Sequence, residues 1–586
     1  MCDCYCFRGR ALIAATALVC TASAELAGAR GAEPRREIVV RDFRICQPQS
    51  ALAATRRAGK WQVIPYSSGA IHGQMLAATS LVDPPTVTLP LRQQGWYRIT
   101  VGIWNPIWGY DGRESVLKLK MSNEPCFRVV KSTGPTGYKG TILQEYEFGA
   151  RDVTGQDLRI AKRSGQKGYL AYVRLTPLAE DQVTALLARR ATSQSRVLVA
   201  SHDGGGYLNR GGAIAITSRE DIWAEIEPYR YSDVKRVSWA VNYSHTTNWP
   251  SRVGTLFSRE FIPGRRDEAS LFGALNGLID QGINPLHEAC QHAHRIGIEF
   301  DAQFRMAMLG RTPPDPQLGF VAEHPSLRMV ARDGTAIEKA SYAFAEARAF
   351  LVSMVRDTVS QVAVDGVTLN FIRGGDYFAF ESPVREAFAK QYHGDARQTE
   401  PNDERLLRVR AAFMTQLVRE VRAELERSSQ QQDRQFKLHA LVYPTRENNL
   451  RHGLDITTWI EQGLIDSILG ASEPEVGTLA HAHRVEWFPG VGGRSIAGYL
   501  RAWTRWHDSA DGYFVWDMDN EVEKSADWQV LGQMGHDEAM RGFAKRQPGE
   551  HLSTTRLTTV GGVEVIKIAN EEAGYPQKFL FLFSGG

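Results

Sequence analysis

The stretch that decides the fold is residues 362–377, Val-Ala-Val-Asp-Gly-Val-Thr-Leu-Asn-Phe-Ile-Arg-Gly-Gly-Asp-Tyr. Its residues Val367, Leu369 and Phe371 alternate with their neighbours at the period of a β-strand. Charged and aromatic side chains follow directly, where the chain would leave a sheet. In a (β/α)8 barrel that end of each strand is the active-site face. The alternative is a buried strand whose charges only cap the next helix. Repetition of the pattern at other strands favours the functional interpretation.

The region around this stretch alternates short apolar runs with long helical patterns, which predicts a parallel sheet. Eight strands are predicted, at residues 197–201, 234–242, 298–306, 366–373, 436–444, 466–472, 485–488 and 512–517. We therefore expect an α/β fold in which residues 198–545 form a (β/α)8 TIM barrel, the catalytic domain. Asp203-Gly-Gly-Gly-Tyr207 lacks the G-x-G-x-x-G spacing of a nucleotide-binding turn, and no cofactor is expected.

The regions before and after the predicted barrel carry different patterns. Residues 1–32 combine two arginines, an apolar run and small-residue cleavage sites, which predicts a signal peptide and a secreted or periplasmic protein. Residues 38–178 carry short alternating runs between turn residues and predict an all-β sandwich, a candidate carbohydrate-binding domain. Residues 179–197 predict a linker helix, and residues 546–586 a C-terminal β-rich extension. In the sandwich, the aromatic residues at 104, 108 and 110 could stack on sugar rings or plug one end of the fold.

Composition excludes several classes of partner. The chain has 69 basic and 66 acidic residues and no long run of either sign, so we expect neither a nucleic-acid surface nor a membrane anchor. The apolar run of the leader is too short for a stable membrane span. Outside the leader, Cys46 and Cys126 could form one bridge in an oxidising compartment, whereas Cys290 is expected to be a buried small hydrophobe. The histidines around Cys290 lack a second cluster that would complete a tetrahedral zinc site, so no metal is expected.

The residues at the carboxyl ends of the predicted strands are acids, amides, arginines and aromatics. Glycoside cleavage needs such a set, because one carboxylic acid protonates the leaving oxygen while a second carboxylate stabilises or attacks the sugar centre. Glu473 and Asp376 are the candidate catalytic carboxylates. Asp365 and Glu381 have structural explanations, at the start of a strand and the start of a helix. The candidate substrate-binding residues are Asp203, Asn370, Arg373, Tyr377, Tyr443, Trp516 and Asp517.

Residues 364–377, the segment Glu381-Ser-Pro-Val-Arg-Glu-Ala-Phe388 and residues 453–466 resemble the family-10-like glycosyl hydrolase group of exported bacterial TIM barrels. The resemblance covers roughly residues 198–540 and implies a glycoside hydrolase. The family usually has an aspartate at the position of Asn370. That departure implies either that the acid role has moved to Asp376 or Glu381, or that the site is impaired.

We therefore expect an exported glycoside hydrolase acting on a poly- or oligosaccharide. Glu473 is the expected general acid, because the apolar strand before it should keep it protonated by desolvation. Asp376 is the expected second carboxylate, kept ionised by Arg373. The alternative is a non-catalytic carbohydrate-binding protein on a decayed barrel, which Asn370 suggests. A third interpretation, a metal-dependent hydrolase such as a deacetylase, lacks a ligand set.

Overall fold

The structure is a computed structural model of the 586-residue chain. It describes residues 36–564, except 56, 70, 80, 106–114, 132–141, 192–195, 210–215, 257–265, 309–318, 494, 521, 523–524, 547–553 and 556. The predicted signal peptide, the aromatic residues at 108 and 110 and residues 565–586 of the predicted C-terminal extension lie outside the described residues. The described residues from Glu37 onward belong to one compact unit. None of the described helices is long and apolar enough to cross a membrane.

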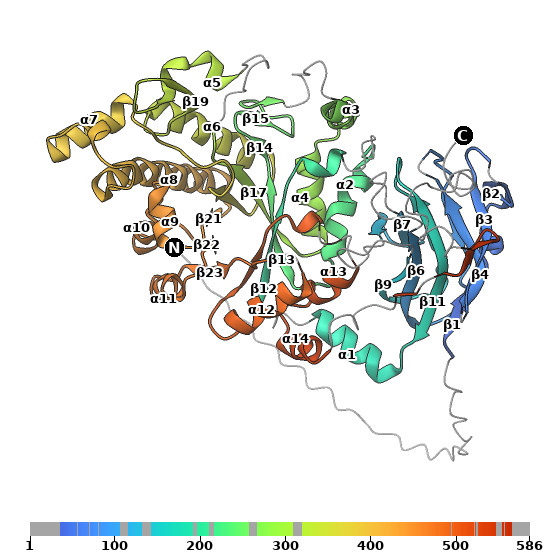
Figure 1. Ribbon diagram of the computed structural model, residues 1–586. Helices are drawn as coiled ribbons and strands as arrows, with labels where there is room; N and C mark the ends of the chain where they lie inside the picture. Colours follow the sequence, from blue (N-terminus) through green and yellow to red (C-terminus); the bar gives the residue numbers. More distant parts are fainter. Residues whose placement is uncertain are drawn as a thin grey trace, which may run out of the picture. The chain divides into compact units, whose positions relative to one another are not determined.

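Eight parallel strands form a nearly closed barrel, as the sequence predicts (Figure 1). In barrel order they are β12 (Val197–His202), β13 (Val234–Ala240), β17 (Glu299–Arg305), β20 (Gly366–Asn370), β21 (Lys437–Leu441), β22 (Ser467–Gly470), β23 (Glu486–Pro489) and β24 (Gly512–Val515). The first and last strands of the chain order, β12 and β24, pair directly. Between β23 and β24, the Val491 N–H donates to the Phe514 carbonyl at 2.9 Å, which brings the two sheet ends together. The fold class is therefore confirmed.

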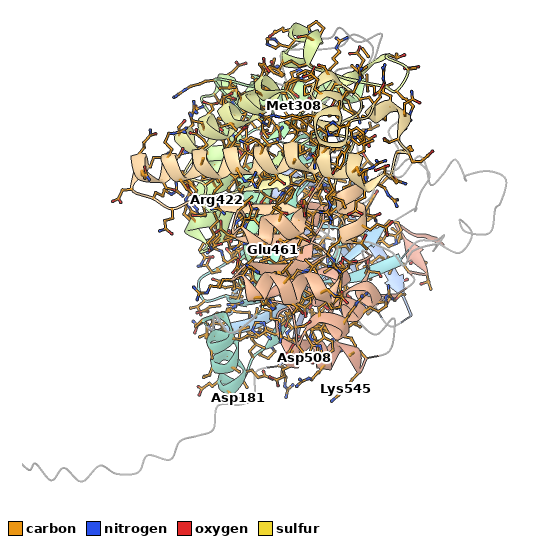
Figure 2. All side chains as sticks on the ribbon, turned by 90° about the vertical axis from the view of Figure 1, so that its left-hand side faces the viewer. Asp181, Met308, Arg422, Glu461, Asp508 and Lys545 are labelled. Carbon is orange, nitrogen blue, oxygen red and sulfur yellow. The ribbon has the colours of Figure 1, made fainter. Side chains whose placement is uncertain are left out.

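Helices lie outside the strands, because each βα unit buries an apolar helix face against the sheet. The described helices of this region are α2 (Arg219–Ile226), α3 (Arg266–Asp280), α4 (Pro285–Arg295), α5 (Phe320–Glu323), α6 (Ala345–Gln361), α7 (Ser382–Tyr392), α8 (Glu404–Gln432), α9 (Arg446–Arg451), α10 (Ile456–Glu461), α11 (Pro474–Ala482), α12 (Ile496–Trp506), α13 (Ser525–Leu531) and α14 (Asp537–Ala544). Figure 2 shows the long α8, which carries Arg422, above α10 with Glu461. The Arg422 side chain donates to the Leu464 carbonyl and to Asp466, which ties α8 to the start of β22.

The N-terminal region is β-rich and folds as two sheets around an apolar core. One sheet has the order β9-β6-β11-β4-β3 within this region, and the other has the order β5-β10-β7-β8. The strands are β1 (Ile38–Val40), β2 (Leu52–Ala53), β3 (Trp61–Ser68), β4 (Ile71–Ala78), β5 (Val87–Leu89), β6 (Trp96–Asn105), β7 (Val116–Met121), β8 (Arg128–Lys131), β9 (Ile142–Asp152), β10 (Leu158–Lys162) and β11 (Gly168–Pro177). Helix α1 (Glu180–Ala191) follows and leads to β12. The domain boundaries drawn from the sequence stay predictions.

The described C-terminal residues add strands to the N-terminal sheet. β25 (Thr554–Thr555) pairs with β9, and β26 (Thr559–Val560) pairs with β3 and with β27 (Val563–Glu564). Strands as short as these three are marginal alone, and the existing sheet supplies partners for β25 and β26.

The structure decides two possibilities that the sequence left open in this region. Cys46 and Cys126 are free and buried, because Cys46 lies in the core between the two sheets whereas Cys126 lies near Glu227 and His292 of the barrel. Trp104 is fully buried, with its ring edge-on to Tyr169 at 5.2 Å between centroids. It therefore plugs the fold and offers no face to a sugar. The third remaining cysteine, Cys290, is buried and free as expected.

Candidate active site at the barrel mouth

The carboxyl ends of four neighbouring strand segments meet at Asp203, which directly follows β12. Arg305, the last residue of β17, donates to the Asp203 carboxylate. The Tyr243 hydroxyl, from β14 (Asn242–Tyr243), donates to the same carboxylate at 3.1 Å, and the Arg373 guanidinium lies at 3.4 Å. Since the ends of parallel barrel strands meet at one face, these side chains form the centre of the mouth.

Asp203 is an ionised carboxylate in a nearly enclosed position. Its side chain is 19% exposed. Burial by itself would raise the pKa of Asp203, but Arg305, the Tyr243 hydroxyl and Arg373 together hold that pKa below its usual value. Burial and the Asp203 charge in turn raise the pKa of the Tyr243 hydroxyl, which therefore stays a hydrogen-bond donor. The mouth thus contains a fixed negative charge with cationic donors on two sides.

Asn370 lies below this centre and is fully buried. Its amide donates to the Gln303 side chain, which donates in turn to Ser201 at 3.2 Å and to the Ser238 carbonyl at 3.0 Å. The Asn370 side-chain oxygen accepts from the Ile372 N–H at 3.1 Å. The expectation that Asn370 binds substrate directly is therefore corrected: its hydrogen bonds hold strand ends together.

Tyr377 requires the same correction. Its side chain is 2% exposed, its hydroxyl donates to the Phe371 carbonyl, and its ring meets the Phe371 ring edge-on at 5.8 Å. A tyrosine with its hydroxyl engaged and its ring in the core cannot contact a sugar. The aromatic side chain at this position therefore serves core packing, whereas the sequence suggested substrate binding.

Trp516 follows β24 and is the aromatic side chain beside the charged centre. The Arg373 guanidinium lies 5.2 Å from the centre of the Trp516 ring, within range of a cation–π contact. Trp516 is half-buried and its neighbour Asp517, also half-buried, has a left-handed backbone with φ 46°. The Arg373 side chain is 45% exposed. Arg373 and Trp516 therefore border the opening where a ligand would enter.

Asp376 lies on a separate part of the rim. Its side chain is 73% exposed, and its carboxylate lies 3.9 Å from the His452 imidazole. Tyr443 stacks on His452, with ring centres 4.4 Å apart, and burial lowers the pKa of His452. Gly375 allows this arrangement, because a Cβ there would lie 2.6 Å from the Tyr443 hydroxyl. The expectation that Arg373 holds Asp376 ionised is corrected, since Arg373 pairs with Asp203 and the backbone turn directs Asp376 toward His452.

Glu473 follows β22 and lies at the first turn of α11. Its carboxylate accepts from the Arg446 N–H at 2.7 Å and lies 3.5 Å from the Arg446 guanidinium. The side chain is 28% exposed and lines a cavity of about 500 Å3 beside α9 and α10, with Asp455 and Glu461 among its other lining residues. Glu473 was expected in apolar surroundings that would keep it protonated. On the side of Arg446 its carboxylate instead faces a cation and a backbone N–H donor. Glu473 and Asp376 do follow strands at the same end of the barrel.

Three residues of this face, Tyr243, Arg305 and His452, were not predicted from the sequence to have a role. Tyr243 and Arg305 stand at the ends of predicted strands, so the strand-end rule that selected Asp203 could have selected them too. His452 follows α9 and is far from any strand end. Only the fold shows that it lies between Asp376 and Tyr443.

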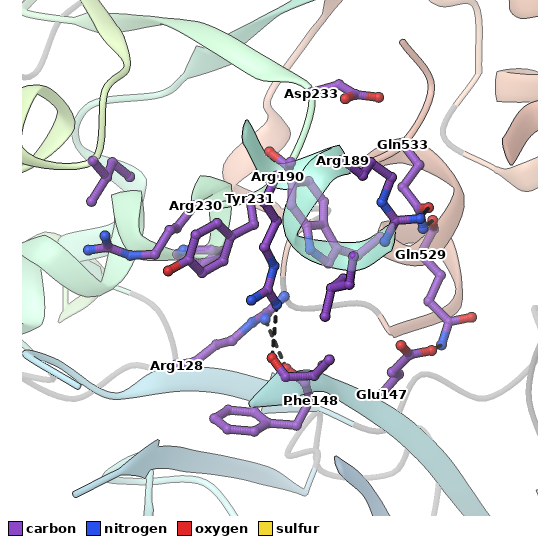
Figure 3. A pocket seen from close by; sticks show the side chains of 18 of the residues that line it. Arg128, Glu147, Phe148, Arg189, Arg190, Arg230, Tyr231, Asp233, Gln529 and Gln533 are labelled. Atoms are coloured by element: carbon purple, nitrogen blue, oxygen red, sulfur yellow. Dashed lines mark hydrogen bonds between the residues drawn. The ribbon is translucent and has the colours of Figure 1, made fainter. Parts of the chain in front are cut away.

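A second cavity, of about 430 Å3, lies away from the mouth (Figure 3). Its lining includes Asp233, which immediately precedes β13, and Gly297, which lies just before β17. These positions belong to the amino-terminal end of the barrel strands. The cavity is therefore separate from the candidate active site.

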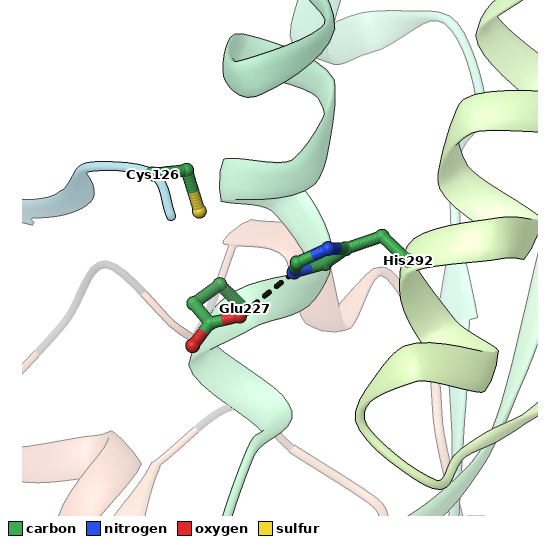
Figure 4. A group of neighbouring side chains, drawn as sticks. All are labelled: Cys126, Glu227 and His292. Atoms are coloured by element: carbon green, nitrogen blue, oxygen red, sulfur yellow. Dashed lines mark hydrogen bonds and ion pairs between the residues drawn. The ribbon is translucent and has the colours of Figure 1, made fainter. Parts of the chain in front are cut away.

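One group among the described residues has the spacing of metal ligands. Side-chain atoms of Cys126, Glu227 and His292 lie within 4.8 Å of one another (Figure 4). His292 bonds to the Glu227 carboxylate at 2.7 Å, and Arg230 donates to both carboxylate oxygens at 2.5 and 2.9 Å. Burial raises the pKa of the Cys126 thiol, which favours the neutral thiol over the thiolate that binds metals. Glu227 and His292 are therefore held by hydrogen bonds beside a neutral thiol. The group lies after α2, on α4 and just before β8, rather than at the mouth.

The eight-stranded parallel barrel, with acids, arginines and aromatics at its carboxyl ends, has the architecture of a TIM-barrel protein. Residues 241–473 match the family described as glycosyl hydrolase-like 10. The resemblance predicted from the sequence is therefore confirmed. The matched segment includes Arg305, Asp376 and Glu473, while Asp203 and Trp516 lie outside it.

Solved structures with a similar arrangement include the PgaB (BpsB) glycoside hydrolase domain from Bordetella bronchiseptica, at 9% identity and a TM-score of 0.38 over 58% of this chain and 99% of that chain. An α-L-fucosidase isoenzyme 2 from Paenibacillus thiaminolyticus matches at 10% identity and a TM-score of 0.37, over 57% of this chain and 49% of that chain. An α-galactosidase, AgaB, from Geobacillus stearothermophilus matches at 9% identity and a TM-score of 0.30, over 81% of this chain and 64% of that chain. A comparison with curated proteins found no match.

Proposed function

We propose that this protein is an exported glycoside hydrolase that cleaves glycosidic bonds in a poly- or oligosaccharide. The observation that carries the proposal is the ionised Asp203, held by Arg305 and Tyr243 at the centre of the barrel mouth. Trp516 borders it, and Asp376 and Glu473 stand on the same face of the barrel. The match to the glycosyl hydrolase-like family supports the same class of reaction.

The chemistry needs one carboxylate that stays ionised beside the sugar and one carboxyl group that donates a proton. Asp203 fits the first role better than Asp376, because two arginines and a tyrosine keep it charged and fixed. An ionised oxygen of Asp203 would stabilise or attack the oxocarbenium-like carbon. Asp376 and Glu473 are the candidates for the proton donor to the leaving oxygen. The catalytic pair expected from the sequence, Glu473 as general acid with Asp376 as second carboxylate, stays a prediction.

The remaining residues of the opening would hold the sugar. Trp516 offers an indole face for stacking on a ring, and Arg373 and Asp517 border it with hydrogen-bonding groups. Tyr443, half-buried against His452, would bind hydroxyls near Asp376. These four residues form a partly exposed rim around the enclosed Asp203.

A second candidate function is carbohydrate binding without catalysis. Asn370 no longer supports it, because that side chain is buried. The surroundings of Asp203 are compatible with binding alone. Guanidinium groups on two sides offset its negative charge, and catalysis needs that charge to stabilise the oxocarbenium-like carbon. Hydrolysis and binding alone would use the same surface of the barrel mouth, and only hydrolysis would release shorter sugars.

The test is to incubate the purified protein with a glycan panel, with and without chelator, and to follow released reducing ends and bound glycan. Chelator-insensitive release of shorter sugars is the expected result. Binding to a glycan without any release would favour the non-catalytic alternative. Release of acetate that stops with chelator would instead indicate a metal-dependent deacetylase and overturn the proposal.

The export part of the proposal rests on the leader sequence and has its own measurement. Expression in a bacterial host with separation of the periplasm and medium should yield a chain that lacks about the first 32 residues. Mass spectrometry of the amino terminus measures this directly. An intact leader on a cytoplasmic protein would contradict export without affecting the hydrolase assignment.

A further inference from the structure

The cavity at the amino-terminal end of the barrel has a strongly basic lining. It measures about 430 Å3 and lies between α1, strand β9, the segment before β13 and the carboxyl end of α4 (Figure 3). Eight arginine and lysine side chains line it, against the two carboxylates of Glu147 and Asp233. Such an excess of positive charge in a concave site attracts anions.

Four of these cations have no carboxylate partner among the described residues. Arg128 donates to the Phe148 carbonyl at 3.3 Å, and Arg190 donates to the Ala150 carbonyl at 2.8 Å. Lys235 donates to a backbone carbonyl at 3.3 Å, and Arg295 lies 4.4 Å over an indole ring. Backbone oxygens and rings satisfy hydrogen bonds but supply no net negative charge. The positive charge of these four side chains is therefore not compensated by any carboxylate among the described residues, whereas Arg98, Arg151 and Arg230 are paired with glutamates.

Arg190 shows this imbalance most clearly. Burial, reinforced by the neighbouring guanidinium of Arg151, lowers the pKa of Arg190 to about 10. Its guanidinium lies 4.1 Å from the centre of the Tyr231 ring and 5.4 Å from that of Trp96. A bound anion would relieve the repulsion between the cations, and the Tyr231 side chain, which is 58% exposed, would give it an aromatic neighbour.

We propose that this cavity binds a multivalent oxyanion, a phosphate or sulfate group that is either free or carried on a sugar. Guanidinium groups bind the oxygens of such anions in pairs, with strong charge-assisted hydrogen bonds. Arg128 and Arg190 already donate to carbonyls two residues apart on β9, so their remaining N–H groups stand near one another. The volume exceeds that of a bare ion and lies in the range of sites for small molecules. This binding does not depend on turnover at the mouth.

The test measures thermal unfolding and calorimetric binding of the full-length mature protein with sulfate and with inorganic phosphate. A saturable rise in Tm of about 2 °C is expected, since a ligand that binds only the folded state stabilises it. Sodium chloride at equal ionic strength is the salt control and should not reproduce the rise. Glucose 6-phosphate and a sulfated disaccharide form the second arm. Affinity at least tenfold tighter for these than for the free ions assigns a sugar-borne group, and equal affinity assigns the free anion.

Variants locate the site. Arg190→Gln should weaken anion binding by about tenfold, because a charge-assisted hydrogen bond is lost. Arg295→Gln, which removes an exposed cation and leaves the fold untouched, should weaken binding by about threefold. The matched control is Arg44→Gln. The Arg44 side chain is 69% exposed, pairs with Asp42 and does not line the cavity. Identical affinity in Arg44→Gln, Arg190→Gln and Arg295→Gln, or a chloride effect equal to that of sulfate, would overturn the proposal.

Discussion

The two ends of the barrel contain similar charged residues in different surroundings. At the amino-terminal end, Arg236 is buried and pairs with Glu299 at 3.0 Å and Glu486 at 3.2 Å. At the mouth, Asp203 pairs with Arg305 in a similar way, but Arg373 beside it is 45% exposed. Around Arg236 the enclosed charge is a cation held by carboxylates, whereas at the mouth the enclosed charge is the carboxylate of Asp203 held by cations. The comparison indicates that the first set serves stability and that the second is available for chemistry.

The largest effect should come from removing the charge at the centre of the mouth. Asp203→Asn keeps the shape of the side chain but removes its charge, so kcat on a cleaved glycan should fall by about 10²–10⁴-fold. The control is Asp395→Asn, on a half-buried carboxylate paired with Arg397 outside the mouth. Steady-state kinetics of both variants measure the difference. Full turnover by Asp203→Asn would exclude Asp203 from catalysis and make Asp376 and Glu473 the next carboxylates to test.

The second effect concerns stability at the opposite end. At pH 8, above the raised pKa of Asp301, Arg236→Met leaves this fully buried carboxylate without its nearest cation, which should cost about 3–5 kcal/mol of unfolding free energy. Arg405→Met is the comparison, since the Arg405 side chain is 53% exposed in its pair with Asp403 and should cost less than about 1 kcal/mol. Urea unfolding gives both values. Equal midpoints for the two variants would remove the proposed contrast between the barrel ends.

The two ends should also respond to pH in opposite directions. Burial raises the pKa of Asp301 from its ordinary 3.8 to about 7 despite Arg236, so the folded protein keeps this proton after the unfolded chain has lost it. This contribution to stability is fully present below pH 3.8 and is lost as pH rises toward 7. Asp203, whose pKa is lowered, contributes stability that is lost when the solution is acidified.

Asp301→Asn isolates this response, because its side chain is neutral at every pH. We expect the variant to gain stability relative to the natural protein as pH rises from 5 to about 7.5, at a slope approaching about 1.4 kcal/mol per pH unit. Urea unfolding at several pH values measures the difference. A constant difference across this range would show that Asp301 is already ionised in the folded protein.

The smallest effect is expected at the rim. Trp516→Ala removes a stacking surface and should raise KM by about tenfold with little change in kcat, while Trp516→Phe should stay close to the natural protein. Saturation kinetics separate the two constants. A fall in kcat without a change in KM would place Trp516 near the reacting atoms instead of the sugar-binding rim.

The sequence was most informative for the barrel strands, because their apolar residues alternate and because the carboxyl ends of parallel barrel strands all lie at one face. Alternating apolar residues predict all eight barrel strands, and each strand end predicts which polar side chains reach the mouth. Asp365 is an example, because it was expected at the start of a strand and its carboxylate accepts from the Phe300 N–H at 2.7 Å. The apolar pattern works because one face of each strand must be buried whatever its neighbours are.

The sequence by itself therefore determined the barrel, the family resemblance and the presence of Asp203, Arg373 and Trp516 at one face. Only the tertiary structure decided that Arg373 pairs with Asp203, that Glu473 pairs with Arg446, and that Asn370 and Tyr377 are buried. The reason is physical. Burial along a strand follows a local period, but the direction of a side chain after the strand depends on the turn that follows and on residues distant in the chain.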